Sequence, residues 1–478
     1  MRKNLLCIAL VFVAALTFGQ TECENGFADN FPCQNYDLMS RLTLSEMDAD
    51  SGNDSWGWTD PTTGKEYALM GLNNGTAFVD ITDPVNLIYL GKLPTHNNML
   101  DGGQIWRDIK VFNNHAFIVS EISGHGMQVF DLTRLRNVAN PPATFTEDAH
   151  YNGFGSAHNI AINEATGFAY AVGTQTFSGG GHYVDINNPT NPVAAGGSSQ
   201  NGYTHDAQIV TYNGPDTAHV GKEIYIGCNT DEVVIFDVSN KNNPIVLGSA
   251  SYTQEAFTHQ GWLTEDHTHF LVNDEADEVA FGVNTRTLIF DVTDLDNPIF
   301  TFGYEGPTSA TDHNLYINGD RAYLANYREG LRIINISDVV NENIEEVGSF
   351  DTFPENNNSG ADNGMWNVYP FFESDNILLS DYNRGLFIVR ESNTLGISEN
   401  STSLDFSIQP NPAITSITIA STNTSLETIE IFSILGQRVK NIQLDKQVKE
   451  TTIDISDLSS GMYLMKTNQN IVKRFIKE

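Results

Sequence analysis

Residues 289–294 read Ile289-Phe290-Asp291-Val292-Thr293-Asp294, a short β-rich run that ends in an acidic residue and a turn. Copies of this unit recur at residues 77–84, 129–132, 183–189, 235–239 and 333–338, with a degraded copy at 386–389. From Asp80 to Asn335, the residue that ends each run follows the previous one by 51, 54, 52, 54 and 44 residues. A unit of about 50 residues with four short strands has the length of one propeller blade. The seven units therefore predict an all-β fold, a seven-bladed β-propeller closed into a ring without free sheet edges.

The Asp that ends each run has a structural and a chemical interpretation. At a strand end, its carboxylate can accept hydrogen bonds from backbone N–H groups of the following turn. A role repeated in every blade is typical of a scaffold. We therefore expect these carboxylates to hold turns.

Each unit also begins in the same way, with a polar residue followed by a strand in which apolar and polar residues alternate. In a propeller the first strand of each blade lines the central channel, so residues at one repeat position form a ring around the axis. Here that ring would comprise Ser55, Arg107, His158, His205, His259, His313 and Trp366, with the register of the first unit open by one residue.

Four of the twelve histidines thus fall at one repeat position: His158, His205, His259 and His313. Converging imidazoles suit a divalent transition metal such as Zn, Cu, Fe or Ni. Arg107, Asp108 and Asp206 are predicted to support this cluster, the two aspartates by orienting imidazole N–H groups. The alternative is a ring of polar groups that bond to the neighbouring blade's backbone or hold water.

A weaker metal candidate is the acidic stretch 273–278, in which Asp274 and Glu275 would bind calcium. The stretch does not follow the EF-hand pattern, and a solvated acidic loop is the alternative. The sequence contains no Gly-x-Ser-x-Gly elbow, P-loop, His-Glu-x-x-His or dinucleotide fingerprint. It therefore does not decide whether the protein is an enzyme, and the catalytic residues and cofactors stay unknown.

The charge is strongly acidic and unevenly distributed. The 478 residues include 25 Lys and Arg and 60 Asp and Glu, for a net charge of −35. From residue 401 onward eight acids balance eight bases, so the acidity belongs to the region before it. Such a surface repels phosphate, which argues against a nucleic-acid partner. The shift in charge marks a domain junction.

The N-terminus has the features of an export signal. A basic start, Met1-Arg2-Lys3, precedes an apolar run from Leu5 to Leu16, which predicts a signal peptide over residues 1–20. No later segment is apolar enough to cross a membrane. In an exported chain, Cys23 and Cys33 are expected to form a disulfide, with two free thiols as the alternative.

The repeats resemble the LVIVD repeat, and longer segments at residues 58–67, 125–132 and 258–266 resemble the choice-of-anchor B family. The similarity extends from about Cys23 to Arg390. It implies an exported repeat protein without an established activity.

The tail resembles the type IX secretion sorting domain of Bacteroidetes, at Phe406-Ser407-Ile408-Gln409-Pro410-Asn411-Pro412, at residues 431–437 and at residues 458–464. Its alternating strands predict a small β-sandwich, for which a sugar-binding module is the alternative. The resemblance implies contact with the type IX secretion machinery, and secretion or attachment to the outer membrane and cell surface. The predicted domains are the signal peptide (1–20), the propeller (21–395), a linker (396–404) and the sorting domain (405–478).

These observations favour a secreted or surface-attached binding or scaffold protein, with an unknown ligand or protein at one face of the propeller. A metal-dependent enzyme that uses the histidine cluster is the alternative.

Overall fold

The computed structural model describes residues 20–97, 106–360, 363–392, 406–409, 413–421, 426–433, 438–459, 461–467 and 472–477. The predicted signal peptide up to residue 19 and the predicted linker lie outside the described residues. The chain divides into two compact units, residues 1–392 and 393–478.

The described strands of the first unit form seven sheets, and in each sheet the strands follow one another outward from an innermost strand. The first four sheets are built from β4 (Gly52–Thr59), β5 (Glu66–Leu72), β6 (Gly75–Asp80), β7 (Ile88–Pro94) and β11 (Ala143–Thr144); β8 (Arg107–Phe112), β9 (His115–Ser120), β10 (Met127–Asp131) and β12 (Ala149–Tyr151); β13 (Asn159–Asn163), β14 (Phe168–Val172), β15 (His182–Asp185) and β16 (Val193–Gly197); and β17 (Asp206–Thr211), β18 (Glu223–Cys228), β19 (Val233–Asp237) and β20 (Ile245–Ala250).

The remaining three sheets follow the same plan, with strands from the N-terminus added at their outer edges. They are built from β21 (Thr258–Leu263), β22 (His269–Asp274), β23 (Arg286–Asp291) and β24 (Ile299–Glu305); β25 (Leu315–Asn318), β26 (Arg321–Asn326), β27 (Gly330–Asp338), β28 (Asn343–Phe350), β2 (Phe31–Gln34) and β1 (Phe27–Ala28); and β29 (Met365–Tyr369), β30 (Ile377–Asp381), β31 (Gly385–Glu391) and β3 (Tyr36–Leu42). Short helices interrupt the loops: η1 (Leu132–Asn137), η2 (Phe177–Gly179), α1 (Asp277–Phe281) and η3 (Val339–Asn341).

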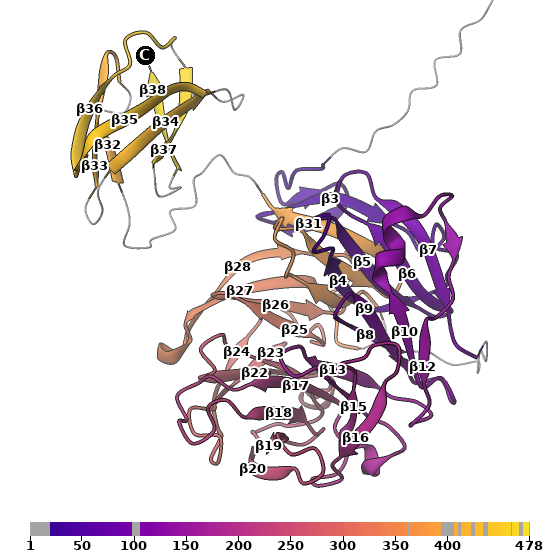
Figure 1. The fold of residues 1–478 in the computed structure, drawn as a ribbon. Helices are drawn as coiled ribbons and strands as arrows, with labels where there is room; N and C mark the ends of the chain where they lie inside the picture. Colours follow the sequence, from indigo (N-terminus) through magenta and orange to yellow (C-terminus); the bar gives the residue numbers. More distant parts are fainter. Residues whose placement is uncertain are drawn as a thin grey trace, which may run out of the picture. The chain divides into compact units, whose positions relative to one another are not determined.

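The sheets close into a ring around a common centre (Figure 1). The innermost strands contact one another in the cyclic order β4, β8, β13, β17, β21, β25, β29 and back to β4. Within the described part of this unit, an apolar cluster also lies between each pair of neighbouring sheets, including the last and the first. The predicted all-β propeller is therefore confirmed, and its hydrophobic core is distributed between the blades.

The N-terminal segment completes the ring. Strand β3 pairs antiparallel with β31, so the seventh sheet combines residues from both ends of the unit. The hairpin of β1 and β2 extends the sixth sheet by pairing with β28. A disulfide joins Cys23 to Cys33 within this segment. These pairings connect the two ends of the ring without a covalent link between them.

The repeated Asp, or the Asn that replaces it at residue 335, holds a turn in six of the units. In six units its side-chain oxygen accepts the backbone N–H two residues further on, at 2.8–3.0 Å; the pairs are Asp80–Thr82, Asp131–Thr133, Asp185–Asn187, Asp237–Ser239, Asp291–Thr293 and Asn335–Ser337. In the five units with Asp the turn ends the third strand and starts the connection to the fourth, whereas the turn at Asn335 lies within β27. The structural interpretation of this residue is confirmed.

The described strands of the second unit form two sheets. One has the order β32 (Phe406–Gln409), β33 (Ser416–Ser421) and β36 (Glu450–Asp454), and the other the order β35 (Arg438–Val448), β34 (Leu426–Ser433), β37 (Gly461–Thr467) and β38 (Val472–Lys477). Apolar residues from both sheets, such as Ile419 and Ile431, share one buried cluster. This packing of two sheets is a small β-sandwich.

Candidate metal centre

Four histidines meet at one mouth of the central channel. His158 and His205 immediately precede β13 and β17, His259 lies in β21, and His313 lies two residues before β25. The imidazole centroids follow one another at 3.9 Å, 4.4 Å and 4.3 Å, from His158 to His313. The indole of Trp366 continues the series, 4.7 Å from His313. The repeat thus brings together residues that lie about 50 positions apart in the sequence.

Backbone carbonyls of the next blade orient two of these imidazoles. Nδ1 of His259 donates to the carbonyl of His313 at 3.1 Å, and Nδ1 of His313 donates to the carbonyl of Trp366 at 2.6 Å. Assigning the proton to Nδ1 in this way leaves a lone pair on Nε2. Metal-bound histidines use the same arrangement, in which the second ring nitrogen donates to a carbonyl or carboxylate.

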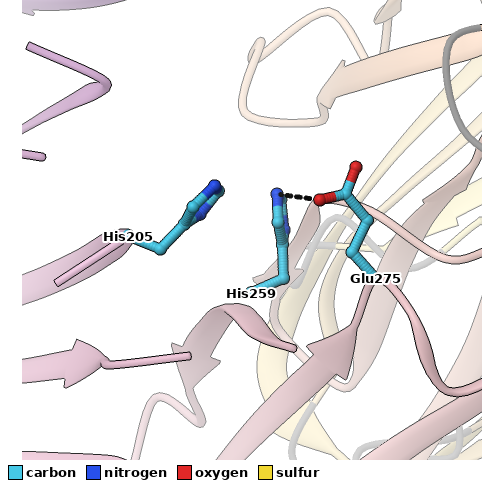
Figure 2. Close-up of side chains that lie close together, drawn as sticks. All are labelled: His205, His259 and Glu275. Carbon is cyan, nitrogen blue, oxygen red and sulfur yellow. Dashed lines mark ion pairs between the residues drawn. The ribbon is translucent and has the colours of Figure 1, made fainter. Parts of the chain in front are cut away.

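Glu275 supplies a carboxylate to the same mouth. It follows β22 directly, and its Oε2 lies 3.5 Å from Nε2 of His259, while Oε1 lies 4.0 Å from Nε2 of His313. The hydroxyl of Tyr327 donates to Oε1 at 2.6 Å. Figure 2 shows the carboxylate facing His259, with the His205 ring on the other side of that imidazole. One ligand atom each from His205, His259 and Glu275 lie within 4.8 Å of one another.

Burial keeps the inner imidazoles neutral. Desolvation lowers the pKa of His259 to about 3 and that of His313 to about 3. It also lowers the pKa of His205 well below its usual value, and the neighbouring histidines act in the same direction. The Nδ1 atom of His205 has no hydrogen-bond partner among the residues that the structure describes. The inner cluster therefore presents uncharged imidazoles, the form that binds metals.

His158 has a different environment from the other three. Its Nδ1 lies 2.6 Å from Oε1 of Glu121, which follows β9 directly. Burial opposes a charge on this imidazole, but the hydrogen bond and charge of Glu121 outweigh it and raise the pKa of His158. His158 therefore takes up a proton more readily than the other three histidines, and its partner at the edge of the cluster is Glu121.

The predicted supporting residues make other contacts. Nε of Arg107 donates to the carbonyl of Leu72 at 2.8 Å, and its Nη1 lies 3.2 Å from Nε2 of His125. Asp108 accepts from the Ile160 amide and from Lys110, and Asp206 accepts from the Ala207 amide. None of these bonds reaches the four histidines. The predicted orienting role of the aspartates is corrected, because one step along an extended strand turns the side chain toward a different neighbour.

The first unit also has a different register from the one predicted. Asn367 donates to the carbonyl of Ser55 as Gln260 donates to that of Leu315, so Ser55 corresponds to Leu315. A register shift between Gly52 and Ser55 produces this difference. Asn53 therefore occupies the position that corresponds to His313, and Ser55 is not part of the ring.

The two predicted calcium ligands are separated in the structure. Asp274 accepts four hydrogen bonds, from the Tyr252 hydroxyl and from the backbone amides of Ala256, Phe257 and Ala276. These four donors use the lone pairs of the Asp274 carboxylate, and the hydrogen bonds stabilise the loop. Glu275 points toward the histidines instead. The sequence does contain a signal for a carboxylate beside the histidines, because Glu121 and Glu275 each directly follow the second strand of a blade.

A second group of possible ligands lies away from the channel and consists of Asp216, His219 and Asp296. Nζ of Lys222 lies 3.2 Å from Nδ1 of His219, and the Asp296 side chain is 60% exposed. The ammonium of Lys222 and the solvent therefore already interact with these possible ligands.

Comparisons with known families match two parts of the chain. The secretion system C-terminal sorting domain matches residues 407–478, and the LVIVD repeat matches residues 218–251 and 312–352. These repeat matches fall on the fourth and sixth sheets. No curated protein matches the chain. No helix in the described ranges has the length and apolar character needed to span a membrane.

Several solved structures match the chain at low sequence identity. PorZ, a surface component of the type-IX secretion system of Porphyromonas gingivalis, is 12% identical with a TM-score of 0.45, over 87% of this chain and 58% of PorZ. Hydrazine synthase of Kuenenia stuttgartiensis is 11% identical with a TM-score of 0.48, over 67% of this chain and 91% of the other. A protein from Lactobacillus plantarum is 12% identical with a TM-score of 0.37, over 71% and 95%. This chain thus spans little more than half the length of PorZ.

Proposed function

We propose that this chain, a protein of LVIVD repeats with a type IX secretion sorting domain, is an exported metal-binding propeller. Its sorting domain makes it a secreted or cell-surface protein and implies an interaction with the secretion machinery. The proposed activity is the binding of one divalent transition metal ion at the histidine mouth, by His205, His259, His313 and Glu275.

One observation supports this proposal: two hydrogen-bond acceptors, an imidazole nitrogen and a carboxylate oxygen, face each other at the histidine mouth. Nε2 of His259, which carries a lone pair because Nδ1 donates elsewhere, faces Oε2 of Glu275 at 3.5 Å. Two acceptors at this distance repel each other unless a cation lies beside both. Imidazole nitrogen with one carboxylate oxygen is a typical ligand set for Zn, Fe, Ni or Cu. A bound ion would convert the repulsion into two bonds.

Removal of two ligands is expected to abolish binding. Purified protein without the predicted signal peptide would be dialysed against Zn²⁺ and its metal content measured by elemental analysis. We expect one ion per chain in the wild type and none in His205→Ala plus His259→Ala, because one imidazole and one carboxylate hold zinc weakly. The control is His115→Ala plus His267→Ala, which removes the same number of histidines away from the channel and should keep the ion. Equal zinc in the two double variants, or none in the wild type, would contradict the proposal.

A further inference from the structure

The opposite mouth of the channel contains a second ring of residues from the repeat. These residues lie three positions after each member of the histidine ring, which is about 10 Å along a strand. All of them line a cavity of about 300 Å³; they are Trp56, Lys110, Ala161, Gln208, Trp262, Tyr316 and Tyr369. A cavity of this size is at the lower end of the range for small-molecule sites. The two mouths have no lining residue in common.

Aromatic side chains form one wall of this cavity. The ring centroids of Trp262 and Tyr316 are 4.9 Å apart, and those of Trp56 and Tyr369 are 5.0 Å apart. Phe371 contacts all four of these rings, at 5.3–6.3 Å. Because the rings support one another edge to face, this wall is rigid before a ligand arrives.

Polar groups from the second, third and fourth blades form the opposite wall. Oε1 of Gln208 accepts from the Leu263 amide at 2.8 Å, and its Nε2 makes no hydrogen bond to any described residue. The carboxyls of Asp206 and Glu164 also line the cavity. The ammonium of Lys110 lies 4.5 Å from the Trp56 ring centroid and 2.5 Å from Oδ1 of Asp108. Donors and acceptors therefore face the aromatic wall across the cavity.

The polar wall carries groups of both signs, so it does not match a ligand with one strong charge. An organic cation would meet the ammonium of Lys110, and an anion would meet Asp206 and Glu164. A neutral ligand with hydroxyl groups can use both donors and acceptors without this repulsion. The aromatic wall requires that the same ligand also presents an apolar face, which can pack against an indole or phenol ring.

We propose that this aromatic mouth binds a neutral sugar ring, with the C–H face of the sugar packed on the Trp262 and Tyr316 side and its hydroxyls directed at Gln208, Asp206 and Glu164. The sugar ring combines one apolar face with an edge of hydroxyls, as the two walls require. This site is independent of the metal ion proposed at the other mouth, so either proposal can fail alone.

The test is titration calorimetry of the purified protein with neutral sugars and charged probes. The neutral panel comprises glucose, galactose, mannose and N-acetylglucosamine; choline is the cationic probe and glucuronate the anionic probe. We expect saturable binding of at least one neutral sugar, with weaker binding of both charged probes. Trp262→Ala should lower the association constant at least about tenfold, the effect of losing one aromatic contact of roughly 1.4 kcal/mol.

Two further variants separate a binding defect from a folding defect. Glu164→Ala changes an exposed residue, so it should fold normally and still bind the sugar several-fold more weakly. The matched control is Trp106→Ala, which removes a tryptophan at the histidine mouth and should leave sugar binding unchanged. The proposal is overturned if no neutral sugar binds, if choline or glucuronate binds more tightly than every neutral sugar, or if Trp262→Ala and Glu164→Ala both bind as the wild type does.

Discussion

Lys110→Met is expected to lower the free energy of unfolding by about 3–5 kcal/mol, because it leaves buried carboxylates without their cation. The Lys110 side chain is 13% exposed, and its Nζ lies 2.5 Å from Oδ1 of Asp108 and 4.0 Å from Oδ2 of Asp54. Burial opposes the charge on this ammonium, but Asp108 and Asp54 outweigh it and raise the pKa of Lys110. Urea denaturation of the wild type and the variant measures the loss.

A second substitution should restore most of this stability. Asp108→Asn removes the charge that Lys110 balances but keeps an oxygen for the Ile160 amide, which donates to Asp108 at 2.7 Å. The control is Lys222→Met, which removes a half-exposed ammonium 3.1 Å from Asp237 and should cost less than about 1 kcal/mol. If Lys110→Met costs no more than Lys222→Met, the buried charge cluster does not stabilise the centre of the ring.

Glu278→Gln is expected to stabilise the protein at high pH. Burial, and then the charge of Asp277, raises the pKa of Glu278 to about 9, and burial raises the pKa of Asp277 to about 7. The pKa of the neighbouring Asp312 is also raised, by burial and by Glu278. The folded protein therefore holds a proton on Glu278 that the unfolded chain releases above about pH 4.5. Stability due to this group is complete below that pH and decreases as the pH rises toward 9.

The glutamine cannot ionise, so it removes this loss and keeps an oxygen for the Asp312 amide, which donates to Glu278 at 3.3 Å. We expect the variant to match the wild type within about 1 kcal/mol near pH 5 and to exceed it by about 5–6 kcal/mol near pH 9, because each unit of the pKa rise from 4.5 to about 9 corresponds to about 1.4 kcal/mol. Thermal or urea unfolding at several pH values measures both. The control is Glu255→Gln at an exposed position, which should leave the pH dependence unchanged. Parallel curves for the wild type and Glu278→Gln would show that this carboxyl does not limit stability at high pH.

The repeat in the sequence was sufficient to predict the propeller and the gathering of its histidines. Spacing between copies such as Asp237 and Asp291 determines which residues are equivalent, and equivalent residues of a closed ring must meet at the axis. The turn role of these aspartates followed from local chemistry alone. The pairing of β3 with β31 was not predicted, because it joins residues about 350 positions apart and leaves no local pattern.

The spacing of the repeats did not predict the directions in which side chains point. A bulge before Ser55 shifts the first unit relative to the others, so its ring member was placed incorrectly. The carbonyl of His313, rather than Asp108 or Asp206, orients a neighbouring imidazole. The aromatic mouth was also missed, although Trp262 lies only three residues after His259 and the same offset gives Tyr316 from His313.

X-ray absorption spectroscopy of the zinc-loaded protein can identify the ligands of the ion at the histidine mouth. We expect a tetrahedral ion with three imidazole nitrogens at about 2.0–2.1 Å and one carboxylate oxygen at a similar distance. We also expect that Glu275→Gln changes the oxygen contribution while the imidazole contribution stays. A spectrum without imidazole scattering, or one that His205→Ala plus His259→Ala leaves unchanged, would contradict a metal centre at the histidine mouth.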